Sequence, residues 1–458
     1  MDPKENMLKT GAGTRRDFLK KAATAAAVAA TTNVFKTPVY GQTTAPATGR
    51  VIGANDRIVV GFVGVGGQGL NSHVKPMKES AQANNLALAA VCDVSKHRVE
   101  EAKTAVGEGC EAYEDYRKLL ERKDIDAVVC STVDHWHTRV SIDSMNAGKH
   151  IYVEKPMCRY ITEAFDIYDT CKKTGKILQV GSQGCSDMKW HKAAEWIKAG
   201  KIGPVVMAQG SYMRNNNKGE WNYAIQSWCT AQDLNWKMWL GDQIKKKKDF
   251  SADDYFRWRK YYQYCAGLLG DLFPHKLYPY VLATGNPEFP LRVAAVGSKK
   301  VLTDKLTPDT PIRDCPEIIQ MIAEFPSGMV MHITSSSVNE IGTQEMIRGH
   351  KATLTMAANR VELKPERPFS EDIDPETSET FPPESIPAHH KNWFDSIRAN
   401  KPPNAGIELA VRVQTIISLA EMSERLSEMC LFDWQTRKIT NGSGKELKPL
   451  TYGWSDLS

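Results

Sequence analysis

The chain has 458 residues and a formal net charge of +5, and 41% of its residues are hydrophobic, which is enough for two or three domains with cores of their own. The first 41 residues hold seven basic and three acidic side chains, so the rest of the chain is nearly neutral and gives no electrostatic reason to expect nucleic acid or anionic lipid as a partner. No stretch reaches the roughly 18 apolar residues of a membrane span, so we expect a soluble protein without a membrane anchor.

The chain begins with a segment that resembles an export signal. Arg15 and Arg16 precede Phe18 and Leu19, and an alanine-rich stretch follows over residues 22–30. Paired arginines before a short, weakly apolar stretch are typical of a twin-arginine leader. We therefore expect a leader over residues 1–41, a linker rich in Thr, Pro, Ala and Gly over residues 42–56, and a periplasmic protein.

Ten cysteines are scattered along the chain without a CxxC pair, so we expect no zinc site, no other metal site and no redox motif. Several of these cysteines stand in apolar runs, as buried free thiols do. Exported proteins often carry disulfides, but the twin-arginine route exports proteins that have folded in the reducing cytoplasm. Free thiols and a cofactor loaded before export both fit that route.

From residue 57 onward, short apolar runs alternate with helical patterns. An alternation of this kind predicts a doubly wound parallel sheet of the Rossmann type, which we place over residues 57–175. The expected strands cover residues 58–63, 86–92, 127–131 and 150–153, and helical segments between them include 96–105 and 113–121.

The second half, residues 176–458, has a different pattern and predicts an α+β domain with a largely antiparallel open sheet. Pro326, Ser327 and Gly328 separate two β-like runs, which is a hairpin signal. Residues 215–264 are aromatic, charged and irregular, and are expected to form loops over a site. The expected strands are 205–212, 318–325, 329–336, 346–348, 352–356 and 360–363, and the closing helices are 389–399 and 408–426.

A glycine-rich turn directly follows the first expected strand. Gly64 would permit the tight turn, Gly66 would let a pyrophosphate approach the backbone, and Gly69 would let the next helix pack closely on the strand. The helix N-terminus would then stabilise the phosphate charge. We therefore expect a dinucleotide to contact Gly64, Gly66, Gly67, Gln68 and Gly69.

Asp93 ends the second expected strand, where a carboxylate can accept hydrogen bonds from the adenosine ribose hydroxyls. A 2′-phosphate at the same place would meet like-charge repulsion, so Asp93 favours NAD over NADP. Lys96 and Arg98 lie nearby in the sequence and could soften that preference.

Three further segments stand where parallel strands or a helix would place them at one edge of the sheet. They are Thr132 to His137 after the third strand, Tyr152 to Pro156 at the end of the fourth, and Gly270 to His275. Taken alone, the first has histidines of a kind that are usually structural, and the second is a common surface turn. Asp271 and His275 are four residues apart, so on one helix they would share a face as an acid/base pair, although Pro274 interrupts that helix unless it lies in the first turn.

Together these segments resemble the Gfo/Idh/MocA oxidoreductases. GFVGVGGQG is similar to the family's dinucleotide turn, VEKP to its Glu-Lys-Pro signature, and Asp271 to His275 to its Asp-x-x-x-His signature. TVDHWH is similar to a Thr-Pro-Asn-x-x-His segment, in which Val133 and Asp134 depart from Pro and Asn. Residues 236–241 and 256–259, together with the leader, resemble the family's exported branch.

The resemblance implies roles for individual residues. Glu154 would bind near the nicotinamide ribose, Lys155 would polarise the reacting oxygen, and His275 would take the hydroxyl proton while Asp271 orients it or the substrate. The family often has a further Asp three residues after that histidine, where this chain has Tyr278, so one substrate contact is in doubt. The cofactor-binding set implied by the resemblance also contains Thr132, His137 and Lys155.

The leading interpretation is an oxidoreductase that moves a hydride between NAD and a hydroxyl or keto carbon of a sugar or cyclitol. The first alternative is a redox-neutral enzyme that keeps NAD bound, oxidises a sugar hydroxyl, eliminates the aglycone and then reduces the product. The second is a non-catalytic nucleotide-bound sensor. By family analogy we expect a homo-oligomer through the open sheet. The sequence does not identify the sugar or the hydroxyl that reacts.

Overall fold

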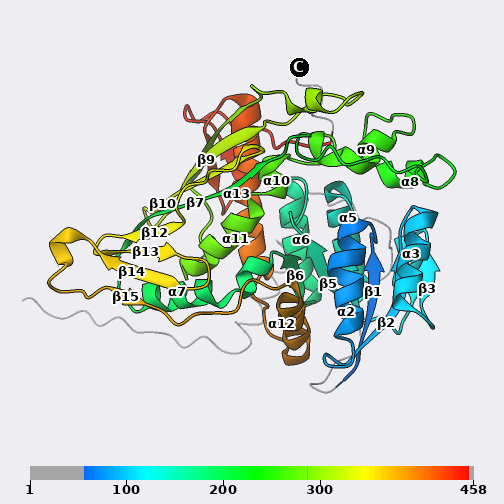
Figure 1. Ribbon diagram of the computed structural model, residues 1–458, viewed down its shortest axis with the longest axis horizontal. Helices are drawn as coiled ribbons and strands as arrows, with labels where there is room; N and C mark the ends of the chain where they lie inside the picture. Colours follow the sequence, from blue (N-terminus) through cyan, green and yellow to red (C-terminus); the bar gives the residue numbers. More distant parts are fainter. Residues whose placement is uncertain (1–55, 286, 453–458) are drawn as a thin grey trace, which may run out of the picture. The chain divides into compact units, whose positions relative to one another are not determined.

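The computed structural model describes residues 56–285 and 287–452. The expected leader and nearly all of the expected linker lie outside these residues. The described part contains two β-sheets with their helices, shown with their labels in Figure 1.

The first sheet has six parallel strands in the order β3-β2-β1-β4-β5-β6, which is the doubly wound Rossmann arrangement that the sequence predicts. Its central strands are apolar and buried on both faces, as parallel strands between two helical layers must be. The strands are β1 (Ile58–Val63), β2 (Leu86–Cys92), β3 (Glu111–Tyr113), β4 (Ala127–Cys130), β5 (His150–Glu154) and β6 (Leu178–Gly181).

The two strands at the edges of this sheet were not predicted. β3 has three residues, none of them β-branched, and β6 contains Gln179 and Gly181, so neither shows a run of apolar residues. The helix predicted over residues 113–121 begins only at Tyr116, because Tyr113 ends β3 and the Asp115 side chain caps the helix by accepting from the Arg117 N–H at 3.0 Å.

Helices from both halves of the chain pack on the first sheet. Those in its own half are α2 (Lys75–Glu79), preceded by a π-helical turn η1 (Gly69–Val74), and α3 (Lys96–Val106), α4 (Tyr116–Glu121), α5 (Asp134–Asn146) and α6 (Ile161–Thr174). From the far end of the sequence comes α12 (Ile386–Ala399), which lies beside α2 and β6 in Figure 1. Its Trp393, Phe394 and Ile397 belong to the same buried cluster as Ile58 and Val60 of β1.

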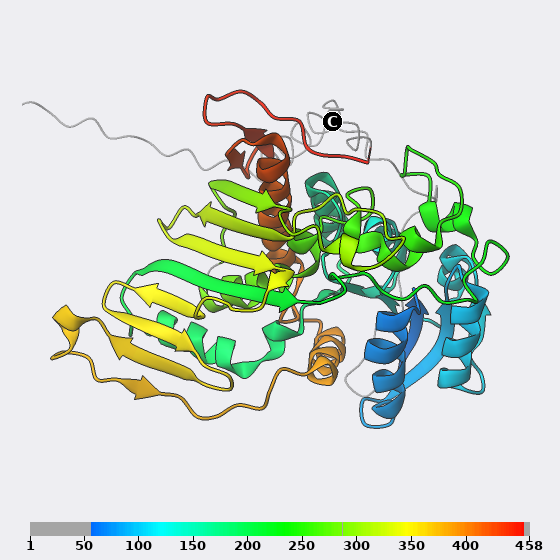
Figure 2. The ribbon, with the colours of Figure 1, turned by 45° about the horizontal axis from the view of Figure 1, so that its top comes forward.

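The second sheet is mostly antiparallel and open, as predicted (Figure 2). Its main path runs β15-β14-β13-β12-β7-β10-β9-β8-β16-β17, and only β7 and β10 pair in parallel. The predicted hairpin is confirmed, since β9 and β10 pair antiparallel with Val330 opposite Glu324. The strands are β7 (Val205–Asn215), β8 (Arg292–Ser298), β9 (Ile318–Glu324), β10 (Val330–Ser336), β11 (Val338–Asn339), β12 (Met346–Gly349), β13 (Ala352–Met356), β14 (Val361–Pro365), β15 (Glu376–Thr377), β16 (Cys430–Asp433) and β17 (Lys438–Thr440).

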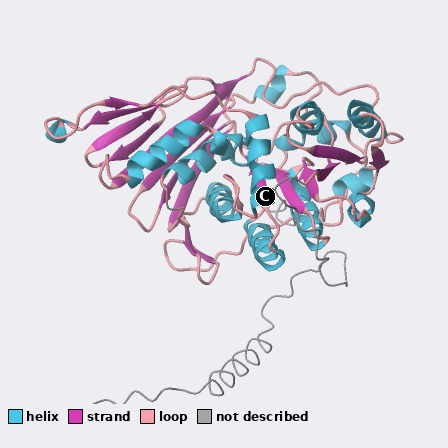
Figure 3. Ribbon diagram, turned by 90° about the horizontal axis from the view of Figure 1, so that it is seen from below, coloured by secondary structure: helices cyan, strands magenta, loops and turns pink. Residues whose placement is uncertain are grey.

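One face of this sheet is covered by helices, as Figure 3 shows. The covering helices include α7 (Met188–Lys198), α11 (Pro274–Ala283) and α13 (Ile407–Leu426). The opposite face presents apolar side chains to solvent: Val296 of β8 is 76% exposed and Ile322 of β9 is 52% exposed. These two residues lie on the same side of neighbouring strands, because Ala294 pairs with Ile322.

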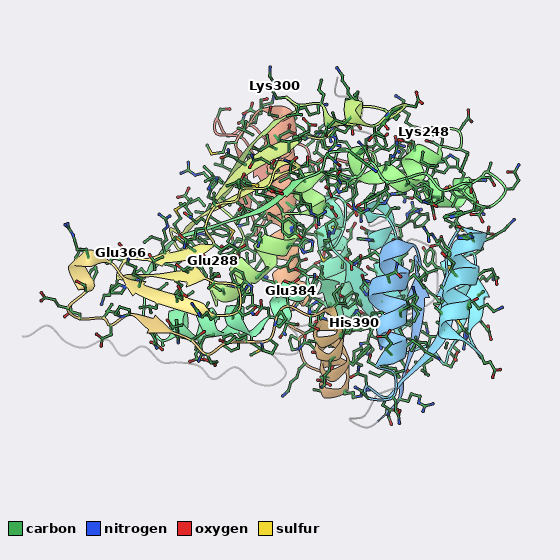
Figure 4. All side chains as sticks on the ribbon, in the orientation of Figure 1. Lys248, Glu288, Lys300, Glu366, Glu384 and His390 are labelled. Carbon is green, nitrogen blue, oxygen red and sulfur yellow. The ribbon has the colours of Figure 1, made fainter. Side chains whose placement is uncertain are left out.

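The aromatic stretch expected to form loops contains only short helical pieces: α8 (Trp236–Leu240), α9 (Ala252–Arg257) and η3 (Trp258–Lys260). Leu234, Trp239, Ile244 and Tyr264 form a small buried cluster within it. Lys248, labelled in Figure 4, lies in these loops between α8 and α9. The remaining short helices are η2 (Gln183–Ser186), α10 (Leu268–Asp271), η4 (Thr303–Leu306) and η5 (Arg367–Phe369).

All ten cysteines are buried free thiols. Within residues 56–285 and 287–452, no helix has the length and apolar character to cross a membrane. The same residues contain no group of three or more His, Cys, Asp and Glu side chains that could hold a metal ion.

Candidate active site

A cleft of about 680 Å³ opens at the carboxyl ends of the first-sheet strands. Ligands of open parallel sheets bind at this edge, because the loops that follow the strands converge there. The loops over residues 215–264 and the start of α11 form the opposite wall. The cleft is lined by all but one of the predicted site residues: Gly64, Gly66, Gly67, Gln68, Asp93, Thr132, His137, Glu154, Lys155, Asp271 and His275.

The glycine-rich turn has the shape that a dinucleotide needs. Gly64 has φ +82°, and a Cβ there would lie 2.5 Å from the Thr132 nitrogen. A Cβ at Gly69, the one predicted residue that does not line the cleft, would lie 2.2 Å from the Gly64 oxygen, so Gly69 serves the close packing of the turn. Added Cβ atoms at Gly66 and Gly67 would meet nothing within 4 Å. The backbone is therefore open toward the cleft where a pyrophosphate would lie.

Asp93 is fixed at the end of β2. One carboxylate oxygen accepts from the Val65 N–H at 2.8 Å, and the other accepts from the Ser95 N–H at 3.0 Å. Burial raises the pKa of Asp93, and these two N–H donors oppose that rise. The carboxylate thus links the glycine-rich turn to the start of α3 while it lines the cleft.

Glu154 ends β5 and is buried among hydrogen-bond donors. Its Oε1 lies 3.0 Å from the Gln68 amide nitrogen and 2.9 Å from His73 Nε2, and its Oε2 accepts from the Lys155 N–H at 3.0 Å. Burial alone would raise the pKa of this carboxyl, but the hydrogen bonds and charges of His73, Lys155 and Gln68 lower it to about 2. Glu154 is therefore a fixed carboxylate at neutral pH.

His73 was not predicted as part of the site. Its Nδ1 lies 2.9 Å from Nε2 of His390, which stands on α12 and is labelled in Figure 4. The two histidines are 317 residues apart, so the sequence carries no signal that pairs them. The chain from His390 through His73 to Glu154 connects the far end of the sequence to the cleft.

Lys155 and Asp271 form an ion pair in the wall of the cleft. Lys155 Nζ lies 2.7 Å from Asp271 Oδ1 and 2.6 Å from the Asp271 carbonyl oxygen. Asp271 also accepts from Arg259 Nε at 3.0 Å and from Trp221 Nε1 at 3.0 Å. Burial opposes ionisation, yet the charges of Lys155 and Arg259 hold the pKa of Asp271 far below its usual range.

Asp271 and His275 were expected to share a helix face if Pro274 lay in its first turn, and Pro274 does lie in the first turn of α11. α10 ends at Asp271 and α11 begins at Pro274, so the two side chains do not lie on one helix. The Asp271 carboxylate instead binds Lys155, Arg259 and Trp221.

His275 lines the cleft and stacks on Tyr212 of β7, with ring centroids 5.0 Å apart. Burial, aided by the Lys155 charge, lowers the pKa of His275 to about 3. The ring is therefore neutral at physiological pH and can accept a proton. Tyr278, which replaces a family aspartate, is fully buried and does not line the cleft, so it offers no substitute substrate contact.

His137 and Thr132 hold the backbone of the cleft in place. His137 Nδ1 lies 2.7 Å from the Pro156 carbonyl oxygen, and its Nε2 lies 3.1 Å from that of Thr132. Both ring nitrogens thus lie within hydrogen-bond distance of main-chain carbonyl oxygens, while the residue lines the cleft; its contact with the cofactor stays a prediction. The Thr132 hydroxyl likewise contacts the Val133 carbonyl oxygen at 3.3 Å.

The sequence reasoning missed most of the side chains at the substrate end of the cleft. The Arg259 guanidinium lies 4.1 Å from the Trp258 ring centroid, and Arg214 pairs with Glu220 at 2.7 Å. Tyr223 lines the cleft and is 46% exposed, and a tyrosine hydroxyl is protonated at neutral pH. The earlier signals were the expectation that residues 215–264 form loops over a site and the resemblance of residues 236–241 and 256–259 to a family branch.

The glycine-rich turn, the parallel sheet and the open sheet with its covering helices define a dinucleotide-binding oxidoreductase fold. The chain belongs to the Gfo/Idh/MocA oxidoreductase family. Residues 58–182 match the family's NAD-binding Rossmann fold, and residues 194–427 match its C-terminal alpha/beta domain.

Similar curated proteins include glycosidases. A glycosyl hydrolase family 109 protein of Shewanella baltica (strain OS185) is 34% identical over 216 residues, which are 43% of this chain and 46% of that protein. An alpha-N-acetylgalactosaminidase of Shewanella oneidensis is 30% identical over 234 residues, 47% of this chain and 50% of that protein. The matched segment thus spans about half the length of these relatives.

Similar solved structures carry the same fold at low identity. A levoglucosan dehydrogenase in complex with NADH has a TM-score of 0.63 and 17% identity, with 82% of this chain and 98% of that chain covered. An aldose-aldose oxidoreductase from Caulobacter crescentus has a TM-score of 0.60 and 17% identity, with 82% and 100% covered.

Proposed function

We propose that this protein is a redox-neutral glycoside-cleaving enzyme that keeps NAD bound through each turnover. Net dehydrogenation was the leading interpretation from sequence, and cleavage was its alternative. The curated relatives at 30–34% identity are glycosidases, and they support the alternative. The dehydrogenase structures at 17% identity support the fold alone.

The proposal rests on one observation: a nucleotide-binding turn and a group of acid/base side chains line the same cleft. A glycine-rich turn open toward the cleft lies at one end, and neutral His275 with the Lys155–Asp271 pair lies at the other. A sugar bound between them would have one hydroxyl within reach of a proton acceptor and a fixed positive charge.

The residues that would hold the cofactor are the open backbone at Gly66 and Gly67, Asp93 toward the adenosine ribose, and Glu154 toward the nicotinamide ribose. When bound, NAD supplies the site that takes up a hydride from the sugar and later returns it. Hydrogen-bond contacts with Gln68 and His73 fix the position of the Glu154 carboxylate.

In the oxidation step, His275 accepts the proton of the sugar hydroxyl, and Lys155 stabilises the charge that develops on the oxygen. Asp271 directs the Lys155 ammonium group, since it accepts from Nζ through both a carboxylate oxygen and its carbonyl oxygen. Lys155 then polarises the carbonyl that results.

That carbonyl makes the proton on the neighbouring carbon acidic. Solvent accepts this proton, the bond to the leaving-group oxygen one carbon further on breaks, and a double bond forms between the two carbons. Tyr223, with a protonated hydroxyl in the cleft, is placed to give a proton to the leaving oxygen. Water then adds to the double bond and the carbonyl is reduced again, so the sum is glycoside plus water giving free sugar and alcohol.

The test uses purified protein without added NAD and a panel of aryl glycosides that includes N-acetylgalactosaminides. We expect repeated release of the aryl alcohol without build-up of the reduced-nicotinamide absorbance. In deuterated water, deuterium should enter the product at the carbon next to the oxidised one. If an oxidised sugar accumulates in step with reduced cofactor, the enzyme is a net dehydrogenase and the proposal fails.

A further inference from the structure

Two carboxylates flank Ser95 in the loop between β2 and α3. The Ser95 N–H donates to Asp93 at 3.0 Å, and the Ser95 hydroxyl donates to Asp233 Oδ2 at 2.7 Å. Asp93 belongs to the Rossmann domain, whereas Asp233 comes from the aromatic loops, 138 residues beyond Ser95.

Asp233 occupies the amino end of α3. Its Oδ1 accepts from the His97 N–H at 2.9 Å, and its carbonyl oxygen accepts from the Lys96 N–H at 3.2 Å. The first N–H groups of a helix have no partner within the helix itself, and the helix dipole favours a negative charge beside them. A carboxylate from another part of the chain thus fills the position that an anion would otherwise take.

Neighbouring contacts fix Asp233 in this place. The Trp228 ring stacks on the His97 ring with centroids 4.4 Å apart and an interplanar angle of 16°. The Asn235 N–H donates to the Val94 carbonyl oxygen at 2.9 Å. The segment over residues 228–235 therefore runs along the loop that follows β2.

We propose that Asp233 is a second determinant of the preference for NAD over NADP. The Ser95 hydroxyl and the N–H groups at the start of α3 are the groups that could bind a 2′-phosphate, and Asp233 already engages them. A 2′-phosphate would also bring about two negative charges close to two carboxylates. The ribose hydroxyls of NAD, by contrast, can donate to Asp93.

Two cations lie near these carboxylates. Lys96 Nζ donates to the Gln232 carbonyl oxygen at 3.0 Å. Arg98 pairs with Glu101 at 2.8 Å, and its guanidinium lies 4.9 Å from the Trp228 ring centroid. Arg98 also lines the cleft with Asp93, and the expectation that these cations soften the effect of Asp93 stays a prediction.

The test measures which nucleotide the intact protein carries. Protein is equilibrated with equal concentrations of NAD and NADP and desalted, and the bound nucleotide is extracted and quantified. Asp233→Asn removes the charge but keeps an oxygen that can cap α3, and should raise the bound NADP:NAD ratio about tenfold. Asp233→Glu keeps the charge and should leave the ratio unchanged.

Asp242→Asn is the matched control, because that side chain lies on the same loops, is 93% exposed and reaches Arg139 only at 4.0 Å. A folded Asp233→Asn variant with the wild-type ratio and melting temperature overturns the proposal. Asp233→Ser, a second uncharged helix cap, gives the same test if Asn impairs folding. The ratio is measured on extracted nucleotide, so the outcome of this test does not depend on whether the protein cleaves glycosides.

Discussion

Lys155 and Asp271 stand 116 residues apart in the sequence and meet at 2.7 Å in the cleft. The contact joins the end of a Rossmann strand to the end of α10 in the second domain. Asp271 holds the ammonium group through two oxygens, so Lys155 is positioned before any substrate binds.

Lys155→Ala should lower kcat by roughly a hundredfold or more, the scale of losing one donor to a developing oxyanion. The variant should retain its nucleotide, because the turn that faces the pyrophosphate lies elsewhere in the cleft. Turnover of an aryl glycoside and extraction of bound nucleotide measure the two effects. Wild-type turnover in this variant would remove Lys155 from the mechanism.

His275→Ala should lower kcat by ~10²–10⁴, the usual contribution of a positioned general base. His275 has a pKa lowered to about 3, so its neutral, proton-accepting form is present at every pH above that value. The pH profile of kcat/KM should therefore show no acid limb near the ordinary histidine pKa of about 6.5. An inflection there that disappears in His275→Gln would contradict the lowered pKa, and wild-type kcat in His275→Ala would contradict the assignment of His275 as the base.

The variants Gly66→Ala and Gly69→Ala distinguish effects on nucleotide binding from effects on protein stability. A Cβ at Gly69 would clash with the Gly64 oxygen at 2.2 Å, so this variant should lower the melting temperature by several degrees. A Cβ at Gly66 meets nothing within 4 Å, so that variant should melt like wild type yet lose bound nucleotide. Equal melting temperatures and equal nucleotide content in the two variants would contradict this division.

Export should depend on the paired arginines of the leader. Replacing both Arg15 and Arg16 with Lys keeps the charge and removes the pair. The protein should then remain in the cytoplasm, as cell fractionation would detect. A periplasmic yield equal to wild type would remove the basis for placing the protein there.

The exposed face of the second sheet should bind a second copy of the chain. Val296 and Ile322 give this face an apolar surface of a kind that marks protein contacts. Ile322→Lys should shift the sedimentation of the protein toward the monomer without lowering its melting temperature, since Ile322 is already 52% exposed. A monomeric wild-type protein would contradict the prediction.

The elements that sequence reasoning predicted are those with long periodic or apolar runs. The four central strands of the first sheet and the hairpin around Gly328 are of this kind. β3 and β6 were not predicted, because edge strands need few apolar residues. The predicted start of α4 was too early, because the Asp115 cap, and not the periodicity of apolar residues, sets where the helix begins.

Within the site, the cleft residues that stand in family motifs were predictable, but their partners and most side chains at the substrate end of the cleft were not. The four-residue spacing of Asp271 and His275 suggested a pair, whereas the tertiary contacts with Lys155 and Arg259 determine where the carboxylate lies. His73 and His390 meet across 317 residues, a separation over which spacing carries no information.

The packing of α12 on the first sheet has a consequence for the order of folding. Trp393, Phe394 and Ile397 complete a core that begins at Ile58, so the Rossmann half cannot bury that face until nearly the whole chain has left the ribosome. During synthesis, the first-sheet strands that are made early would expose an apolar surface to solvent until α12 packs on them. The nucleotide site of a nascent chain therefore reaches its folded structure only after the last third of the chain has been made. Until then, a chaperone that covers the exposed apolar surface would protect the chain.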